Sequence, residues 1–319
     1  MAPHAAPTRS ARLYRHARKK PTWRPSMLSW SIYVIGILAL VVGFYPQVSA
    51  WFSSYNQSLI VENYNAQLAH ARPSAEEQLR QAREYNDALS AGVVLESNAR
   101  VASGVGTSSN ADLKYNNILR VNSQGLMARL KVPSVDIDIP VYHGTSDAVL
   151  LKGSGHLEGS HLPVGGPSTR SVLTAHRGLA SSTMFTNLDK VKESDTFSIE
   201  VFGEVLVYRV RDIKVIAPED TDTLKVEANK DLVTLITCTP LGVNSHRILV
   251  TGERVESVPG EVLKDATAAP TIPGFPWWAV WIGLGLLVLT GYLARQGRVD
   301  SRQRMRLGKR ADESSVLID

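Results

Sequence analysis

Two long uncharged runs near the ends of the chain constrain its fold more than any other feature. They are residues 28–45 and 277–294, each with 18 residues and no Asp, Glu, Lys or Arg. A helix needs roughly 17–25 apolar residues to cross the hydrocarbon core of a bilayer, and apolar residues up to Phe52 extend the first run. The sequence therefore predicts two membrane-spanning helices.

The first run also has a feature of cleaved signal peptides, because a basic region precedes it. It is longer than a typical signal core, however. Phe44, Tyr45 and Trp51 are typical of interfacial anchors and not of a small-residue cleavage site. We expect an uncleaved helix.

Basic tails flank both runs on their outer sides. Residues 1–27 and 295–319 each contain seven Lys or Arg, so the positive-inside rule places both termini in the cytoplasm. Residues 46–276 contain 21 Lys and Arg against 26 Asp and Glu, a net charge of −5, and the overall charge of +5 therefore arises in the tails. This distribution predicts contact with anionic membrane lipid and no nucleic-acid partner.

The segment between the runs begins with a helical pattern over residues 46–91. Arg72 and Pro73 interrupt this pattern, and the capping-box sequence from Ser74 to Glu77 predicts that a new helix begins there. Residues 92–114 are polar and rich in glycine, which is typical either of a loop that covers a site or of a flexible linker.

Residues 115–257 consist of short β-patterned runs separated by turns rich in Gly, Pro and Ser, such as residues 153–155 and 165–168. Such a succession predicts a closed β-barrel or a β-sandwich. Residues 258–276 form a linker to the second membrane run. The expected strands are residues 127–132, 137–142, 171–176, 196–202, 206–216, 232–238 and 247–255.

Cys238 is the only cysteine in the chain, and it ends the β-branched run 234–238. A thiol is only a few per cent ionised at neutral pH, so a nucleophilic cysteine needs a nearby cation or imidazole. His176 ends another apolar run, and Arg247 opens the run after Cys238. If these three strands are neighbours, the three side chains gather at one edge of the sheet.

The other histidines near this region lie in or beside polar turns. We expect each of them to be a surface residue without a role, and His246 to lie on the face opposite to Arg247. No group of His and Cys has the spacing of metal ligands, so the sequence predicts neither a metal site nor a cofactor. These histidines are His143, His156, His161 and His246.

Residues 234–238 together with Arg247 resemble the signature of sortases, the cysteine transpeptidases of Gram-positive cell surfaces. Residues 162–166 and the sequence His176-Arg177-Gly178 resemble the pilin-polymerising class C branch. The resemblance covers residues 115–255 and implies a mostly β fold, an eight-stranded barrel with a helical lead-in and two flanking membrane helices.

The resemblance also implies roles for the site residues. Cys238 would be the nucleophile, His176 the general acid and base, and Arg247 the group that binds the oxyanion. Thr237 and the backbone amide of Thr239 would contact the substrate. Class C enzymes carry an Asp-Pro-aromatic tripeptide on a lid; here the nearest acid and aromatic residue are Asp112 and Tyr115, without the proline.

The implied substrates are pilins or surface proteins with a Leu-Pro-x-Thr-Gly-like sorting signal, cleaved after Thr and joined to a pilin lysine. Three alternatives remain open at this point. They are a housekeeping sortase that attaches proteins to peptidoglycan precursor, a peptidoglycan transpeptidase, although its His-Gly-Cys context is missing, and a membrane-anchored adhesin without enzymatic activity.

Overall fold

The computed structural model describes residues 23–90, 93–94, 103–104, 107–108 and 113–316. Its contacts divide the chain into two units, one formed by Met1–Gly43 with Ala279–Asp319 and the other by Phe44–Trp278. We describe each unit by itself.

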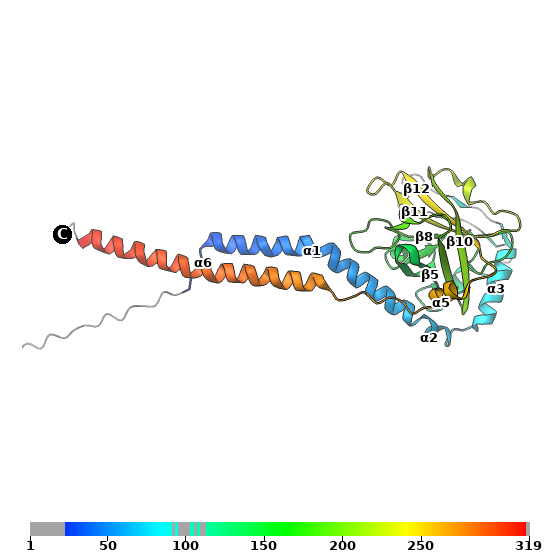
Figure 1. Ribbon diagram of the computed structural model, residues 1–319, viewed down its shortest axis with the longest axis horizontal. Coiled ribbons are helices and arrows are strands. Elements are labelled where there is room, and N and C mark those ends of the chain that lie inside the picture. Colours follow the sequence, from blue (N-terminus) through cyan, green and yellow to red (C-terminus); the bar gives the residue numbers. More distant parts are fainter. Residues whose placement is uncertain (1–22, 91–92, 95–102, 105–106, 109–112, 317–319) are drawn as a thin grey trace, which may run out of the picture. The chain divides into compact units, whose positions relative to one another are not determined.

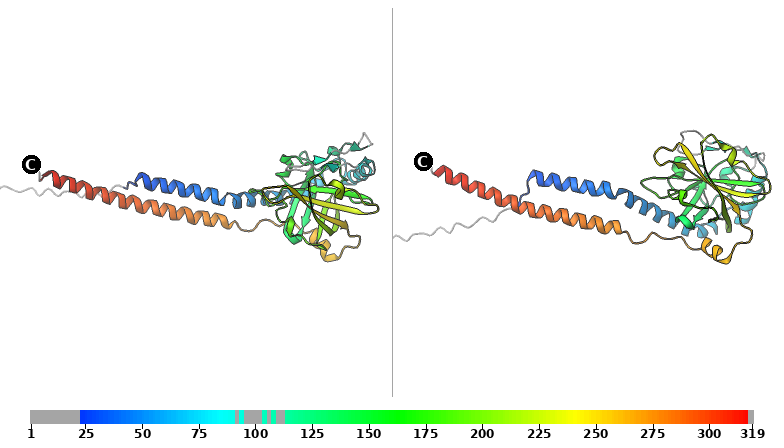
Figure 2. Two further views of the ribbon diagram at one scale, coloured as in Figure 1. Left: turned by 90° about the horizontal axis from the view of Figure 1, so that it is seen from above. Right: turned by 45° about the horizontal axis from the view of Figure 1, so that its top comes forward.

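The first unit contains the start of α1 (Met27–Glu62) and almost all of α6 (Trp277–Val316). Both helices are long and apolar enough to cross a membrane, as the sequence predicts. They lie side by side in each view (Figures 1 and 2). A Cβ added to Gly285 would lie 2.9 Å from Leu40, so glycine permits this close approach. At the start of α1, the amide of Ser26 donates to Asp300 of α6 (2.7 Å).

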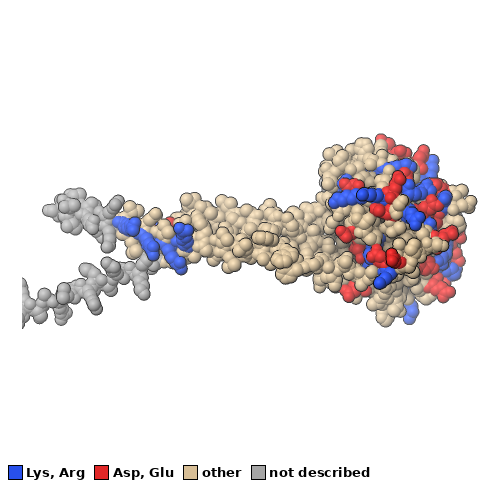
Figure 3. Space-filling model, in the orientation of Figure 1, with Lys and Arg blue, Asp and Glu red and all other residues tan. Residues whose placement is uncertain are grey.

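The surface of the helix pair is uncharged along most of its length and carries Lys and Arg at its far end (Figure 3). Arg295, Arg298 and Arg302 lie on the part of α6 that follows the apolar run. The basic residues therefore belong to the continuation of a helix that is apolar enough to cross a membrane.

The second unit begins with the rest of α1, α2 (Tyr64–Leu68) and α3 (Ala75–Asp87). The predicted restart at residue 74 is confirmed, because the Ser74 hydroxyl accepts a hydrogen bond from the amide of Glu77 (3.4 Å) and α3 follows directly. One face of α3, including Leu79, Ala82 and Tyr85, is buried.

The closed barrel has eight strands, in agreement with the predicted fold, and the order around it is β10-β12-β11-β8-β7-β6-β5-β9. Two neighbouring pairs, β6 with β7 and β8 with β11, are parallel. The strands are β5 (Leu126–Val132), β6 (Ile137–His143), β7 (Ser154–His156), β8 (Thr169–Thr174), β9 (Thr196–Val201), β10 (Glu204–Ile216), β11 (Asp231–Thr239) and β12 (His246–Arg254).

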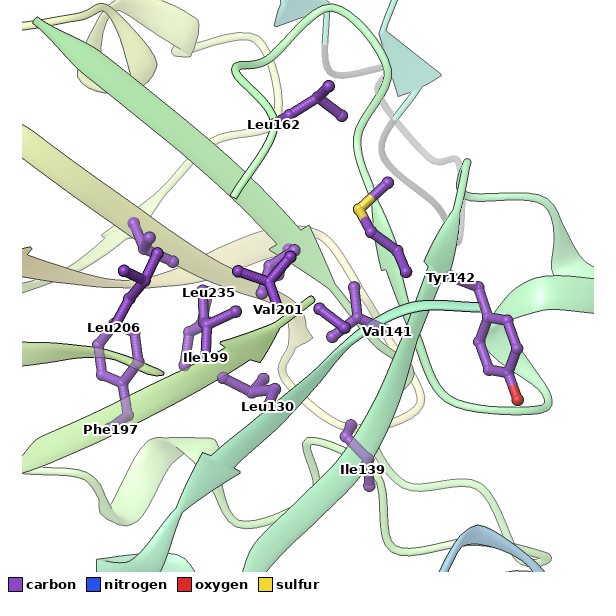
Figure 4. Packing of buried hydrophobic residues seen from close by; sticks show 14 of the residues in the cluster. Leu130, Ile139, Val141, Tyr142, Leu162, Phe197, Ile199, Val201, Leu206 and Leu235 are labelled. Carbon is purple, nitrogen blue, oxygen red and sulfur yellow. The ribbon is translucent and has the colours of Figure 1, made fainter. Parts of the chain in front are cut away.

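The barrel interior is filled by alternate apolar residues of these strands (Figure 4). Leu130, Ile199 and Leu235, from three different strands, are all 0% exposed. Residues of this core cluster recur at every second position of β9, at Phe197, Ile199 and Val201, as expected of a strand with one face toward the core.

Strand β7 was expected to be a turn, and that expectation is wrong. All three of its residues pair with β6, Gly155 and His156 also pair with β8, and the strand completes the barrel. A Cβ on Gly155 would lie 2.3 Å from the carbonyl oxygen of Gly144, and one on Gly153 would lie 2.3 Å from that of Pro140. Glycine is therefore present to permit close backbone approach between strands.

The remaining elements are short. The ladder of β2 with β3 lies within the predicted lid segment, residues 92–114, most of which is outside the described residues, and β2 lies next to η4. A second ladder joins β4 of that segment to β1, which precedes it. These elements are β1 (Leu89–Ser90), β2 (Val93–Val94), β3 (Ser103–Gly104), β4 (Thr107–Ser108), η1 (Tyr115–Asn117), η2 (Pro133–Val135), α4 (Asp147–Leu150), η3 (Leu188–Lys190), η4 (Thr221–Leu224) and α5 (Gly260–Ala266).

Candidate functional site

The three candidate catalytic residues come from adjacent strand ends. Cys238 on β11 is the direct cross-strand partner of Arg247 on β12. The parallel register between β8 and β11 last pairs Thr174 with Ile236, so His176 and Cys238 each lie two residues beyond that pair. The strand arrangement on which the sequence prediction depended is therefore present.

A small apolar cluster supports the face of the sheet on which these residues lie. Because side chains alternate along a strand, Cys238 shares its face with Ile236, and Arg247 shares its face with Leu249. Ile236 and Leu249 both belong to this cluster, and so does Leu224, which lies in the connection between β10 and β11. The barrel core lies on the opposite face of the sheet. The site therefore lies outside the barrel, and this apolar cluster packs beneath it.

A pocket of about 380 Å³ opens at this edge of the barrel. It brings His176 and Cys238 together, although their strands are 62 residues apart in the sequence. Its lining residues are Asp147, Leu151, His176, Arg177, Gly178, Leu179, Cys238, Gly242 and Asn244.

Arg247 is 1% exposed and is not among the residues that line this pocket. Its Nη1 donates to the carbonyl oxygens of Asn244 (2.9 Å) and His246 (3.1 Å). These bonds fix the guanidinium against the turn that follows β11, where Asn244 also lines the pocket. A fixed positive charge is thus placed beside the strand position of the thiol.

Two opposing effects act on the half-buried Cys238 thiol. Burial raises the pKa of Cys238, and the positive charge of Arg247 acts in the opposite direction. Because burial is the larger effect, the thiol favours its protonated form. A nucleophilic attack then requires a base, and His176 is the imidazole that lines the same pocket.

The two threonines that flank Cys238 make different contacts. Thr237 is 1% exposed, and its hydroxyl donates to the carbonyl oxygen of Ala175 (2.9 Å). Thr239 Oγ1 accepts a hydrogen bond from Arg177 (3.0 Å). Both hydroxyl groups therefore connect β11 to the segment that carries His176. Substrate contacts of these residues remain a prediction.

Of the two candidate lid residues, Asp112 lies outside the described residues. Tyr115 is buried in η1, where its hydroxyl contacts His156 Nδ1 (2.9 Å) and accepts a hydrogen bond from the amide of Gly144 (2.9 Å). Tyr115 is not among the described residues that line the Cys238 pocket.

Three of the other four histidines are buried, so the expectation of surface positions is wrong for them. His156 is 0% exposed; its Nε2 contacts the carbonyl oxygen of His161 (2.9 Å). Burial lowers the pKa of His156 to about 3, so it is neutral at physiological pH. Hydrogen bonds to backbone groups replace water around His143 and His161. His246 is exposed, in agreement with its predicted face.

The sequence prediction missed several lining residues. Arg177 was named only as part of the sequence His176-Arg177-Gly178. Asp147 begins the four-residue helix α4 and Leu151 directly follows it, and a helix this short gives no periodic signal. Within the described ranges, no three His, Cys, Asp or Glu side chains are placed to hold a metal ion.

The barrel region is similar to known proteins in sequence and in fold. A family model described as "Sortase domain" matches residues 130–255. Sortase D of Bacillus subtilis (strain 168) is 26% identical over 129 residues, which are 40% of this chain and 62% of that protein. The chain thus spans less than two thirds of the length of this curated relative.

Two solved structures are similar over most of their own length. The crystal structure of sortase C-1 from Actinomyces oris is 43% identical; the match covers 58% of this chain and 100% of that one, with a TM-score of 0.52. Sortase C of Streptococcus pneumoniae is 35% identical; the match covers 63% of this chain and 98% of that one, with a TM-score of 0.53.

Proposed function

The chain belongs to the sortase family, and from this membership we propose that it is a membrane-anchored cysteine transpeptidase that joins pilin subunits. The observation that carries the proposal is the cross-strand pair of Cys238 and Arg247 at the edge of a pocket that His176 also lines. A thiol, a base that can take its proton and a fixed cation are the three requirements of thioester chemistry on an amide.

In the first half of the reaction, His176 takes the Cys238 proton and the sulfur attacks the carbonyl carbon of the sorting-signal threonine. Arg247 stabilises the negative charge that develops on the carbonyl oxygen, because a guanidinium stays charged at any relevant pH. The Thr–Gly amide bond breaks, His176 gives its proton to the departing amine, and a thioester with Cys238 remains.

In the second half, an amine replaces the sulfur. The amine nitrogen attacks the thioester carbon, His176 takes a proton from the nitrogen, and that proton returns to the Cys238 sulfur as it leaves. The product is a new amide between the threonine carbonyl and the acceptor. We propose a pilin lysine as this acceptor, since the similar pneumococcal enzyme is described in connection with pilin substrate specificity.

We also propose the membrane orientation. Both termini would lie in the cytoplasm and the barrel outside the cell, because basic residues precede α1 and follow the apolar run of α6. An extracellular barrel would meet exported proteins with Leu-Pro-x-Thr-Gly-like signals, and the basic end of α6 would contact anionic lipid.

The proposal is tested with the full chain in detergent micelles, a sorting-signal peptide as donor, and either a pilin lysine peptide or a wall-stem amine as acceptor. Mass spectrometry should detect a thioester on Cys238 and an amide product with the pilin lysine. The Cys238→Ala variant is the control. A product with only the wall-stem amine would indicate a housekeeping sortase, and the absence of any thioester would refute the enzymatic proposal.

A further inference from the structure

The side chain of Arg177 connects three separate segments of the chain. Its Nη1 donates to Thr239 Oγ1 (3.0 Å), its Nη2 to Asp189 Oδ2 (2.5 Å) and its Nε to the carbonyl oxygen of Thr186 (3.3 Å). The Arg177 side chain is only 9% exposed. A guanidinium is planar, so three acceptors in different directions hold it in one orientation.

Two of the acceptors belong to the segment after β8. Thr186 also accepts a hydrogen bond from the amide of Gly178 through its hydroxyl (3.1 Å), and Phe185 donates its amide to the carbonyl oxygen of His176 (3.0 Å). Arg177 therefore belongs to a folded turn that fixes the backbone immediately after β8. The third acceptor, Thr239, is on a different strand.

The contact with Thr239 completes a pair of connections around the two candidate reacting groups. One residue before His176 and Cys238, the hydroxyl of Thr237 donates to the carbonyl oxygen of Ala175 (2.9 Å). One residue after His176 and Cys238, Arg177 donates to Thr239. The parallel register of β8 and β11, continued by two residues, places the imidazole and the thiol between these connections.

We propose that Arg177 is a positioning residue that holds the His176 imidazole at the correct distance from the Cys238 sulfur, through its hydrogen bond to Thr239. The inference rests on the proposed transpeptidase function for its kinetic consequence. Proton transfer requires hydrogen-bond reach between the base and the thiol. A displacement of about 1 Å can lower a catalytic rate about 100-fold, so a connection that sets this distance affects the rate directly.

Arg177 also lines the pocket, and a direct contact with the substrate is the rival role. The directions of its donors favour positioning, because all three guanidinium nitrogens already donate to protein acceptors. A substrate group would have to compete with Asp189, whose carboxylate is ion-paired with the same guanidinium.

The test compares Arg177→Gln and Thr239→Val with Thr239→Ser in the full chain. Thr239→Val removes the acceptor hydroxyl and keeps the branched shape, whereas Thr239→Ser keeps the hydroxyl. Arg211→Gln is the matched control, because it removes an ion-paired guanidinium that contacts Glu227 and Glu253 and does not line the pocket. Release of the leaving fragment from a sorting-signal peptide measures kcat and KM.

A second measurement does not depend on turnover. The rate of Cys238 alkylation by iodoacetamide is recorded as a function of pH for each variant, with His176→Ala as the reference for a thiol without its imidazole. If the sorting peptide is not cleaved by the unmodified protein, the proposed function fails, and the alkylation profiles still test the role of Arg177.

We expect Arg177→Gln and Thr239→Val each to lower kcat by about 10-fold or more with KM changed less than about twofold. Their alkylation profiles should approach that of His176→Ala. Thr239→Ser should recover most of the rate, and Arg211→Gln should not change the profile. If Arg177→Gln does not fold, the comparison of the two Thr239 variants alone decides.

Three results would overturn the inference. A raised KM with kcat unchanged would assign Arg177 to substrate binding. Alkylation profiles that match the unmodified protein in both Arg177→Gln and Thr239→Val would reduce the contact to a structural one. A Thr239→Ser variant as impaired as Thr239→Val would show that the hydroxyl is not the group that matters.

Discussion

Replacing Tyr64 by phenylalanine tests how the helical lead-in is attached to the barrel. The hydroxyl of Tyr64 donates to the carbonyl oxygen of Met127 (3.0 Å) and accepts from the amide of Phe202 (2.9 Å). Met127 is the extra residue of a β-bulge in β5, between Leu126 and Ala128. A bulge leaves one residue outside the ladder, so Tyr64 supplies a partner that the neighbouring strand does not.

The other partner lies at the tip of a hairpin. Phe202 and Gly203 connect β9 to β10, with φ of 47° and 89°. Positive φ at both residues is typical of a type I′ turn. The amide of Phe202, in this turn, donates to the hydroxyl of Tyr64. The hydroxyl of Tyr64 thus joins one helix to two separate parts of the barrel, and burial raises the pKa of Tyr64, which keeps its proton in place.

The magnitude follows from the two groups that lose their partner. Tyr64, Met127 and Phe202 are 1%, 0% and 3% exposed, so water does not replace the lost hydroxyl. An unsatisfied buried polar group costs about 1–3 kcal/mol, which puts the loss of folding free energy at about 2–6 kcal/mol. For a unit of this size, about 1 kcal/mol shifts the thermal midpoint by about 2–4 °C, so we expect a decrease of at least about 4 °C.

Thermal unfolding of the full chain in detergent, followed by tryptophan fluorescence, measures this midpoint. Tyr55→Phe is the matched control, since Tyr55 is half-buried and stacks on Trp51 through its ring. A Tyr64→Phe midpoint within about 1 °C of the unmodified protein would refute the reasoning, because it would show that neither backbone group depends on the phenol.

Three further predictions concern the site and its surroundings. In peptide cleavage assays, Cys238→Ala should abolish turnover, His176→Ala should nearly abolish it, and Arg247→Lys should lose much of it because a point charge replaces a planar fork; unchanged turnover in His176→Ala would contradict the assigned roles. Arg247→Gln should slow alkylation of Cys238 at neutral pH, because the charge that lowers the pKa of this thiol is removed and less thiolate forms; equal labelling rates at every pH would contradict this. The pKa of His156 is lowered from 6.5 to about 3 in the folded protein, so the stability that depends on its neutral form is present above pH 6.5 and is lost as the pH falls toward 3. The slope should be at most about 1.4 kcal/mol per pH unit, and thermal midpoints at several pH values should fall less steeply in His156→Gln than in the unmodified protein.

Much of the fold could be predicted because its signals are local. An uncharged apolar run, a capping sequence before α3 and short β-branched runs between turns each depend on neighbouring residues only. The residue types of Cys238, His176 and Arg247 likewise indicated thiol chemistry from their positions at the ends of apolar runs. These local features determine which segments form strands and helices.

Strand β7 could not be predicted, because Gly155 within it and Gly153 before it are favourable only when Gly144 and Pro140 lie against them. The same reason explains the buried histidines. A polar residue beside a turn is expected in water, and only the packing of His156 against Tyr115 and the carbonyl of His161 makes its burial favourable.

The amino-acid sequence by itself determined the membrane runs, most of the strands and the identity of the three candidate reacting groups. Only the tertiary structure decided that Cys238 pairs with Arg247, and that Arg177, which follows β8, reaches Thr239 on the neighbouring strand β11. The physical reason is that propensity and hydrophobic period act over a few residues, whereas register and hydrogen bonds between distant segments depend on closure of the whole barrel.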